Sequence, residues 1–422
     1  MRYAAIKNER ISLISTEPFE NKKINIVEIP DKLDHISAKQ LIINGRVKNG
    51  EVIYKHLKKP ASEMKIALVS NYGSACGIGT YSKFLFEEII NYVGDYKLFI
   101  EKQDKYEIEN PKIPSDKIMA CWKRGESNLE LVEAIKEYEP DVVLIMHEFG
   151  IWPTAPIWLS LISQLSNYRI ITTMHSIFPY HQDKTIYEAA TPEIVVHLQG
   201  AKDCLVNEKK ISGKVYVIPH GCYPIGDQSK LWNTYKSNHT FIQTGFNFPY
   251  KNYKSSILAT AILKKKYPDI FFTALLSESP HNMDGHTLHF NQLSELVNQL
   301  GIQDNVSLIR GFQSENVINS YLRTNQVGVF PYMSVPGHEV FGSSGAARWA
   351  MSAGLPIISS SIHHFSDLPT IKANSPEEIA TALDYLFSSE DARKQQIDKQ
   401  NQFISDHSWN KIAQQYIKIF EN

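Results

Sequence analysis

Two short segments rich in glycine and serine could bind an anion. Residues 73–80 read GSACGIGT, and Ser343-Ser344-Gly345 precede the stretch AARWAMSA. At the start of a helix, such segments bring backbone N–H groups close to a ligand, and the helix dipole favours phosphate. In the first segment the candidate phosphate contacts are Gly77, Gly79 and Thr80. It is neither a full dinucleotide fingerprint nor a Walker loop, so a tight packing turn is the alternative. For the second segment the alternative is an ordinary serine cap.

Charged and titratable side chains follow several of the apolar runs. Lys251 lies in GFNFPYKNYK, where a lysine could offset the charge of a diphosphate. His147-Glu148, His175 and His220 end the runs LIMHE, ITTMHS and VIPHG. Polar residues at the carboxyl ends of buried strands often face a ligand, and satisfied structural histidines are the alternative. His363-His364 has no nearby acidic or thiolate partner in the sequence, so no metal site is predicted.

These side chains must be positioned by strands and helices. In the first half, apolar runs predict strands at 65–72, 141–148, 169–176 and 214–221, with helices near 81–92 and 155–165. In the second half, strands are predicted at 240–246, 270–277, 305–312, 326–332 and 355–361, with helices at 255–266, 290–300, 314–323 and 343–353. This alternation predicts an α/β protein with two Rossmann-like domains facing a cleft, and ligands at the carboxyl ends of the strands.

Residues 1–63 differ from the rest of the chain. Short β-rich runs at 11–16, 23–29, 39–47 and 51–57 predict a small N-terminal β-rich extension, and Asn49-Gly50 is a strong hairpin signal. A strand layer packed on the main body is the alternative. Residues 60–63 read as a linker.

Length and composition limit the classes of protein. The 422 residues suggest two or three domains. The net charge of −1 shows no basic excess of the kind that duplex-binding proteins carry. The four cysteines form no close pair, so zinc or redox chemistry is not indicated. There is no signal-peptide pattern and no apolar stretch of about 20 residues, so the expected location is the cytoplasm, either free or peripheral to a membrane.

Taken in order, the motifs resemble a known family. The strings GIGTYSKFL, HEFGIW, TTMHSIFP, VIPHG, TGFNFPYKN, YPDIFFTAL, IRGF, VFPY and SSGAARWAMSAGLPIIS are similar to the retaining family-four glycosyltransferases of the GT-B fold, in a bacterial mannosyltransferase-like branch. The resemblance covers about residues 64–420. It implies an acceptor-side domain at 64–236, a nucleotide-sugar-binding domain at 237–403 and a helix at 404–422 that crosses back to the first domain.

The resemblance also implies roles for single residues. Lys251 matches a lysine that holds the donor phosphates, and His175 matches a histidine near the transferred sugar. Gly77 and Gly79 match a loop over the diphosphate, and the serine-glycine segment 343–345 matches a phosphate-binding helix start. Glu339 matches the first of two glutamates in the family. The implied catalytic residues are His175, Lys251 and Glu339, and contacts to the sugar or acceptor are expected from His147, Glu148 and His220.

Three positions depart from the family pattern. Phe246 stands where an arginine is usual, and Trp349 stands where the second glutamate is expected to hold a ribose. Glu339 is two residues farther from Gly354 than the family spacing. Arg348, beside Trp349, could add charge near a phosphate. Recognition of the ribose, and with it the base, is therefore open.

The expected reaction moves a hexose from a nucleoside diphosphate sugar to an acceptor hydroxyl of a glycan, a lipid-linked sugar or a small molecule, with no metal and no other cofactor. Residues 1–63 are expected to position the acceptor or to join subunits of a homo-oligomer. One alternative is a phage-type enzyme that glycosylates modified DNA bases, and another is a non-catalytic GT-B scaffold or subunit. A nicotinamide-dependent dehydrogenase is excluded, because the fingerprint and its acidic ribose-binding residue are missing.

Overall fold

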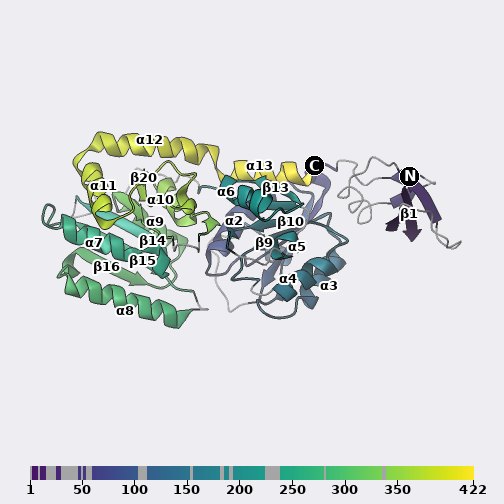
Figure 1. Ribbon diagram of the computed structural model, residues 1–422, viewed down its shortest axis with the longest axis horizontal. Coiled ribbons are helices and arrows are strands. Elements are labelled where there is room, and N and C mark those ends of the chain that lie inside the picture. The colour runs from purple at the N-terminus through teal and green to yellow at the C-terminus, as the bar shows by residue number, and fades with distance from the viewer. Residues whose placement is uncertain are drawn as a thin grey trace.

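The computed structural model describes residues 59–102, 112–152, 155–180, 185–189, 193–223, 238–279, 282–334 and 339–422. It also describes the backbone of five strands between residues 2 and 53. The described residues form one antiparallel sheet, two large parallel sheets and one two-stranded sheet (Figure 1). No helix within this part of the chain is long and apolar enough to cross a membrane.

The first sheet is made by the N-terminal residues. Its order is β3-β1-β2-β4-β5, and all its pairs are antiparallel. Strands β4 and β5 pair with Lys48 opposite Glu51, which confirms the predicted hairpin; Asn49-Gly50 lies outside the described residues. Strand β1 was not among the predicted strands. The five strands are β1 (Arg2–Lys7), β2 (Arg10–Ser15), β3 (Asn25–Ile29), β4 (Arg46–Lys48) and β5 (Glu51–Ile53).

The second sheet has seven parallel strands in the order β13-β12-β10-β9-β6-β7-β8. Its strands are β6 (Lys65–Ser70), β7 (Asp95–Glu101), β8 (Ile118–Trp122), β9 (Val142–His147), β10 (Arg169–Met174), β12 (Glu193–Val196) and β13 (Lys214–Val217). The helices around it are α2 (Gly77–Ile89), α3 (Leu129–Tyr138), α4 (Ala155–Gln164), α5 (Thr185–Ala189) and α6 (Gln199–Asp203), which continues into a π-helical turn at Cys204–Glu208. The turns Ala61–Glu63 and Ser115–Lys117 are 3-10 helices. The four strands predicted here are confirmed, whereas β7, β8 and β12 were missed.

The third sheet has six parallel strands in the order β16-β15-β14-β17-β19-β20. Its strands are β14 (Thr240–Phe246), β15 (Phe271–Ser277), β16 (Val306–Arg310), β17 (Val327–Phe330), β19 (Ile357–Ser359) and β20 (Ile371–Lys372). Its helices are α7 (Tyr253–Leu263), α8 (Met283–Gln299), α9 (Glu315–Arg323), α10 (Gly345–Ser352), α11 (Pro376–Ser388) and α12 (Glu390–Asp406). The 3-10 turns Pro249–Lys251, Gln303–Asn305 and His363–Phe365 connect them. All five strands predicted for this half are present.

Local sequence explains where many of these elements begin. Serine side chains cap the starts of α9, α10, α11, α12 and the C-terminal helix α13 (Trp409–Phe420) by accepting a backbone N–H from the first turn. The parallel strands are apolar on both faces, because each sheet has a hydrophobic core on either side. Fully buried strands of this kind leave only their ends free to carry a site.

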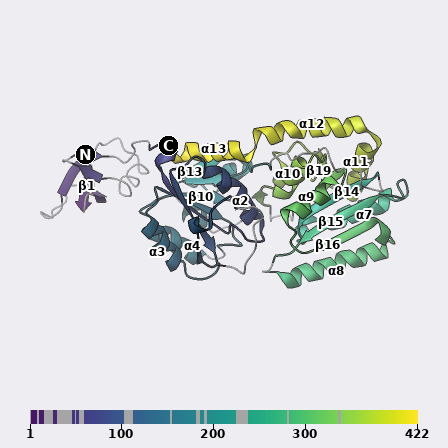
Figure 2. The ribbon, with the colours of Figure 1, turned by 180° about the vertical axis from the view of Figure 1, so that it is seen from behind.

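The end of the chain returns to the first domain. Figures 1 and 2 show α12 and α13 (Trp409–Phe420) running one after the other along both large domains. Helix α13 packs on α2, with the Tyr416 hydroxyl 3.1 Å from that of Tyr81. The Arg169 guanidinium donates to the carbonyls of Ile419 and Phe420, both at 2.6 Å, and so caps the last turn. The two large domains are therefore held together at this edge.

The docking of α13 depends on a close contact with Gly221. A Cβ atom at this position would lie 2.4 Å from the Trp409 ring, which is far inside van der Waals contact. We expect Gly221→Ala to lower the free energy of unfolding by about 1–3 kcal/mol, as overpacking does. Urea denaturation measures this, with Gly150→Ala as the control because a Cβ there meets nothing within 4 Å. Equal stability of the two variants would contradict the prediction.

Candidate functional site

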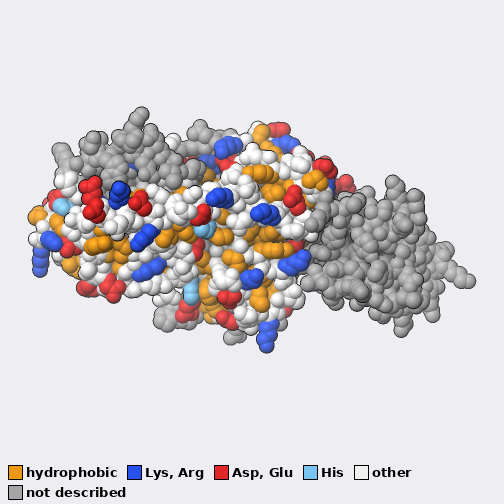
Figure 3. Space-filling model, turned by 90° about the horizontal axis from the view of Figure 1, so that it is seen from above, with side chains coloured by type: hydrophobic (Ala, Val, Ile, Leu, Met, Phe, Trp, Pro, Cys, Tyr) orange, Lys and Arg blue, Asp and Glu red, His pale blue; other side chains and the backbone are white. Residues whose placement is uncertain are grey.

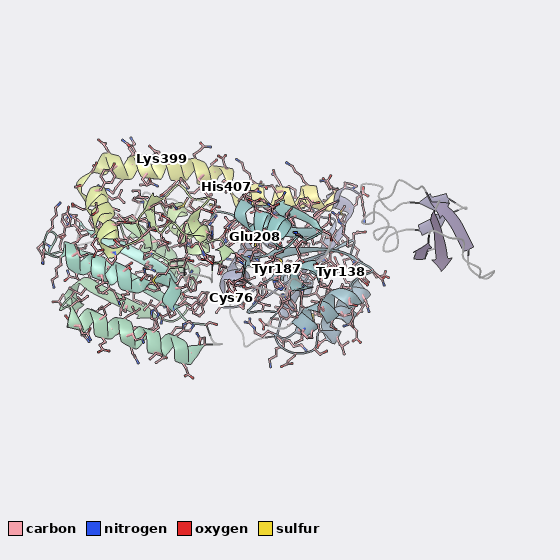
Figure 4. All side chains as sticks on the ribbon, viewed as in Figure 1. Cys76, Tyr138, Tyr187, Glu208, Lys399 and His407 are labelled. Atoms are coloured by element: carbon pink, nitrogen blue, oxygen red, sulfur yellow. The ribbon has the colours of Figure 1, made fainter. Side chains whose placement is uncertain are left out.

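A cavity of about 720 Å³ lies between the two parallel sheets. Its walls are the loops that follow β6, β9, β10 and β13 in the first domain, and β14 and β17 in the second. Figure 4 places Cys76, which lines this cavity, between the two large domains. The lining includes most of the predicted site residues: Gly77, Thr80, Glu148, His175, His220, Lys251, Ser343, Ser344 and Gly345. Segments more than 260 residues apart in the sequence thus meet at one place.

The serine-glycine segment forms the start of α10 at the cavity wall. The Ser344 hydroxyl caps the helix by accepting the Ala347 N–H at 3.3 Å and also lies 3.1 Å from the Tyr332 hydroxyl. The Ser343 hydroxyl is buried without a hydrogen-bond partner among the described residues. The N–H groups of Gly345 and Ala346 are in the first turn, so they have no partner within the helix. Ser344 therefore acts as an ordinary helix cap, and the same helix start also has unpaired N–H donors, those of Gly345 and Ala346, at the cavity wall.

The glycine loop after β6 forms the start of α2 on the opposite wall. The Cys76 thiol caps this helix by accepting the Gly79 N–H at 3.2 Å. A Cβ atom at Gly77 would meet nothing within 4 Å, whereas one at Gly79 would lie 2.7 Å from the carbonyls of Asn71 and Ser74. Gly77 and Thr80 line the large cavity, and Gly79 instead lines a small neighbouring one. Packing thus explains Gly79, whereas Gly77 is open to a ligand.

Lys251 carries the positive charge on the cavity wall. It ends the turn Pro249–Lys251, and its carbonyl accepts a hydrogen bond from Gln243 at 2.7 Å. The ammonium lies 3.7 Å from the Tyr332 ring centroid and 4.9 Å from that of Tyr250. No carboxylate of the described residues pairs with it, and burial lowers the pKa of Lys251 to about 7. A half-buried ammonium flanked by aromatic faces is able to bind an anion.

Three histidines from the first domain meet beside the cavity. His175, His197 and His220 follow β10, β12 and β13, and their rings pack around Tyr81 with centroids 4.6–5.1 Å from its ring. Burial lowers the pKa of each of these histidines, so their rings are neutral near pH 7. The cavity wall therefore offers neutral imidazoles and one cation rather than a cluster of positive charges.

Besides Gly79, two predicted residues do not reach the cavity. His147 is fully buried, and neither ring nitrogen has a hydrogen-bond partner among the described residues; its ring packs against Phe149 and Trp158. From the end of β9 its ring points toward Trp158 on α4, so it is a core residue rather than a cavity residue. Glu339 also lies outside the lining, although its neighbour Val340 is part of it. The geometry favours neither residue as a ligand contact.

Glu148 does line the cavity. Its carboxylate accepts the Ser176 hydroxyl at 2.7 Å and the Phe149 N–H at 3.0 Å, while burial raises its pKa. The ring of Phe178 lies on the same wall. A carboxylate beside an aromatic ring suits the hydroxyls and apolar face of a sugar.

The departures from the family pattern have separate explanations. The Arg348 guanidinium is fully buried and bonds Asp367 and the carbonyls of His220 and Ser344, so it does not reach the cavity lining. Trp349 lines the cavity, stacks on Tyr223 at 4.5 Å and donates its N–H to Asn319 at 2.8 Å. Phe246 lines the cavity near Phe312, with ring centroids 6.3 Å apart. Aromatic rings occupy both positions where the family has charged groups.

Several lining residues were not predicted as site residues, including Tyr81, His197, Tyr223, His363 and His364. The signal for His197 was present, because EIVVHL is a short apolar run that ends in a histidine like the others. His363 and His364 were considered only as metal ligands. In the described residues, no group of three or more His, Cys, Asp or Glu side chains is arranged to hold a metal ion.

The two domains are also joined across the cavity. Strand β11 (Ser176–Ile177) pairs antiparallel with β18 (Phe341–Gly342), directly beside His175 and Ser343. A salt bridge of 2.7 Å links Lys83 on α2 with Glu315 on α9. The cavity walls therefore come from two domains in direct contact.

Comparisons with known proteins agree with this architecture. Residues 226–403 match the family model "Glycosyl transferases group 1". No protein with a curated function matches the sequence. Similar solved structures include a sucrose-phosphate synthase from Thermosynechococcus elongatus (TM-score 0.64, 16% identity, covering 85% of this chain and 98% of that one). They also include Anabaena HepE with UDP and glucose (0.62, 14%, 85% and 100%), and a trehalose-phosphate synthase from Burkholderia xenovorans with glucose-6-phosphate (0.67, 14%, 85% and 100%).

At this level of identity, the similar structures establish the fold. The chain has the GT-B fold, with two Rossmann-like domains and a cavity between them. The family match in the second domain supports a glycosyltransferase.

Proposed function

We propose that the protein is a retaining glycosyltransferase that moves a hexose from a nucleoside diphosphate sugar to an acceptor hydroxyl. The observation that carries this proposal is the convergence of Lys251 with the unpaired donors at the start of α10. A diphosphate needs such a cation together with oriented N–H groups. Retention and the hexose follow from the family resemblance. Several structural relatives bind UDP, a UDP-sugar analogue or a sugar phosphate.

The proposed chemistry breaks the bond between the anomeric carbon and the β-phosphate oxygen. Negative charge then grows on that oxygen, and fixed donors aimed at it usually supply the largest catalytic term. Lys251 and the N–H groups of Gly345 and Ala346 are such donors. The acceptor oxygen bonds to the anomeric carbon, and its proton leaves with the diphosphate. These residues perform the step without a metal ion.

The remaining lining residues suit the sugars. We propose that His175 contacts the transferred sugar, and that Glu148 and His220 lie toward the sugar or acceptor. The contact between the domains would keep water from the donor and so limit hydrolysis. Trp349 and Phe246 present aromatic faces to the cavity, which suits stacking on a base or ribose better than charged recognition.

A thermal-shift panel of UDP-, GDP-, ADP- and dTDP-sugars tests the proposal. A ligand at a hundredfold excess over its dissociation constant stabilises the fold by about 2.7 kcal/mol, so one member should raise the melting temperature clearly. The member that binds is then incubated with candidate acceptors, and the released diphosphate is measured. Absence of a shift with every donor would favour the scaffold alternative instead.

The surface bears on the alternative of a DNA-modifying enzyme. On the face shown in Figure 3, lysine and arginine side chains are interspersed with aspartate and glutamate. Proteins that grip a duplex usually gather basic side chains into a patch. This face therefore offers no support for the DNA alternative.

The N-terminal β-rich extension is expected to be dispensable for donor binding. The described cavity lining contains no residue before Cys76, and the two parallel sheets use no strand before β6. A variant of residues 64–422, if it folds, should keep the donor-induced thermal shift and change acceptor transfer or oligomeric state. Transfer assays and light scattering measure these properties against the full chain. A folded variant that has lost donor binding would contradict the prediction.

A further inference from the structure

One histidine beside the cavity has no role in the reaction described above. His197 follows β12, and its ring lies between those of His175 and His220, with centroid distances of 5.0 and 5.8 Å. It is 4% exposed, and both its ring nitrogens are bonded. These bonds determine which nitrogen of His175 carries a proton.

The first bond fixes the protonation of His197. Its Nδ1 lies 3.0 Å from the carbonyl oxygen of Ile218. A carbonyl oxygen only accepts, so His197 Nδ1 must carry the hydrogen. In a neutral imidazole the other nitrogen, Nε2, is then an acceptor.

The second bond determines which nitrogen of His175 is protonated. His197 Nε2 lies 3.1 Å from His175 Nδ1, so His175 Nδ1 must donate. The reverse arrangement needs a charged His197 ring, which would be a buried cation with Arg348 as a neighbouring charge. Burial lowers the pKa of His197 to about 4, which also opposes that arrangement.

His175 Nε2 therefore carries no hydrogen and has a lone pair available at the cavity. His175 lines the cavity, and its Nε2 is buried with no hydrogen-bond partner among the described residues. An unpaired buried acceptor costs free energy until a donor reaches it. The neighbouring groups that face His175 are Tyr81, His147, His197 and His220, and none of them donates to Nε2.

We propose that His197 is a positioning residue that holds His175 as the neutral Nδ1–H tautomer, so that the cavity meets an acceptor nitrogen that takes a hydroxyl group of the substrate. This inference rests on the proposed function for the identity of the substrate. A lone pair attracts a hydroxyl hydrogen and repels a phosphate or carboxylate oxygen. The hydroxyl-bearing sugar therefore lies at His175, and the diphosphate lies toward Lys251 and α10.

The tautomer is measured directly by NMR of protein labelled with ¹⁵N-histidine, without any ligand. The His175 signals are assigned by their loss in His175→Gln. In the wild type at pH 7, we expect a protonated Nδ1 and an unprotonated Nε2. In His197→Leu the acceptor is gone, and His175 should shift toward the Nε2–H form. His197→Gln offers an amide oxygen near the same place and should restore the wild-type pattern.

Ligand binding supplies the second measurement. The probes are UDP-glucose and UDP, or the sugar nucleotide and free nucleotide of whichever panel member binds. His197→Leu should weaken binding of the sugar nucleotide by about 2- to 10-fold and leave the free nucleotide unchanged, because the neutral hydrogen bond that is lost is made only to the sugar. Val196→Ala is the matched control, since Val196 is buried in the core on the other side of the sheet. It should leave both affinities unchanged.

The outcomes separate this inference from the proposed function. A wild-type His175 that is charged or carries its hydrogen on Nε2 would overturn the inference, as would an unchanged tautomer in His197→Leu. Equal weakening of both probes would overturn the link to a hydroxyl. If no nucleotide sugar in the panel binds, the proposed function is contradicted. The tautomer of His175 measured without ligand still decides the role of His197. If His197→Leu does not fold, the wild type and His197→Gln give the decisive spectra.

Discussion

Replacing Lys251 by alanine is expected to lower turnover by about two to three powers of ten, the loss typical of removing one preorganised donor to developing charge. The ammonium lies 3.7 Å from the Tyr332 ring centroid and is the only charged group on the cavity wall, within the described lining, that can attract a phosphate. Steady-state kinetics with the donor found in the thermal-shift panel measure this. Lys254→Ala is the matched control, because Lys254 is exposed on α7 and does not line the cavity.

The low pKa of Lys251 allows a second measurement of its role, because binding of the diphosphate should be coupled to proton uptake. Because burial lowers its pKa to about 7, this lysine is mostly neutral at pH 8.5 in the free protein. A bound diphosphate favours the charged form, so its pKa rises on binding and the complex takes up close to one proton. Calorimetry in buffers of different ionisation enthalpy measures the uptake. Lys251→Ala should bind without it, and an identical uptake in both proteins would show that another group titrates.

Replacing Ser343 by aspartate is expected to weaken donor binding by roughly 100-fold or more. The Ser343 hydroxyl lies at the cavity wall beside the start of α10 and has no described partner. Two like charges about 5 Å apart repel by roughly 3 kcal/mol at an effective dielectric constant near 20. A carboxylate at the start of a helix is favourable for the helix itself, so this variant should remain folded.

The matched control is Ser343→Asn, which has nearly the same size and no charge. Titration calorimetry with the binding nucleotide sugar compares the two variants. We expect the asparagine variant to bind within about tenfold of the wild type, because it loses no charged contact. Equal affinity in the two variants would place the diphosphate elsewhere in the cavity.

Much of the fold could be predicted from the sequence, because its signals are local. Buried parallel strands are continuous apolar runs, and this property identified β6, β9 and β10 as well as the five predicted strands of the second domain. Strands β7 and β8 were missed because polar or partly exposed residues interrupt them toward the edge of their sheet. Strand β12 was missed although its run EIVV is as apolar as those of the predicted strands β13 and β17, which are equally short.

The sequence by itself determined the α/β class, the glycine and serine segments that begin α2 and α10, and the lysine after β14, since each depends on neighbours along the chain. Only the tertiary structure decided what these residues meet. Arg348 was expected near a phosphate, but its partners come from distant segments and bury it. His147 is the last residue of one buried strand and His175 directly follows another, yet only His175 reaches the cavity. The protonation of His175 depends on His197 and on the carbonyl of Ile218, 43 residues away in the sequence. Such contacts depend on the order of the strands in each sheet and on how the two domains pack together. The spacing of residues along the sequence does not predict them.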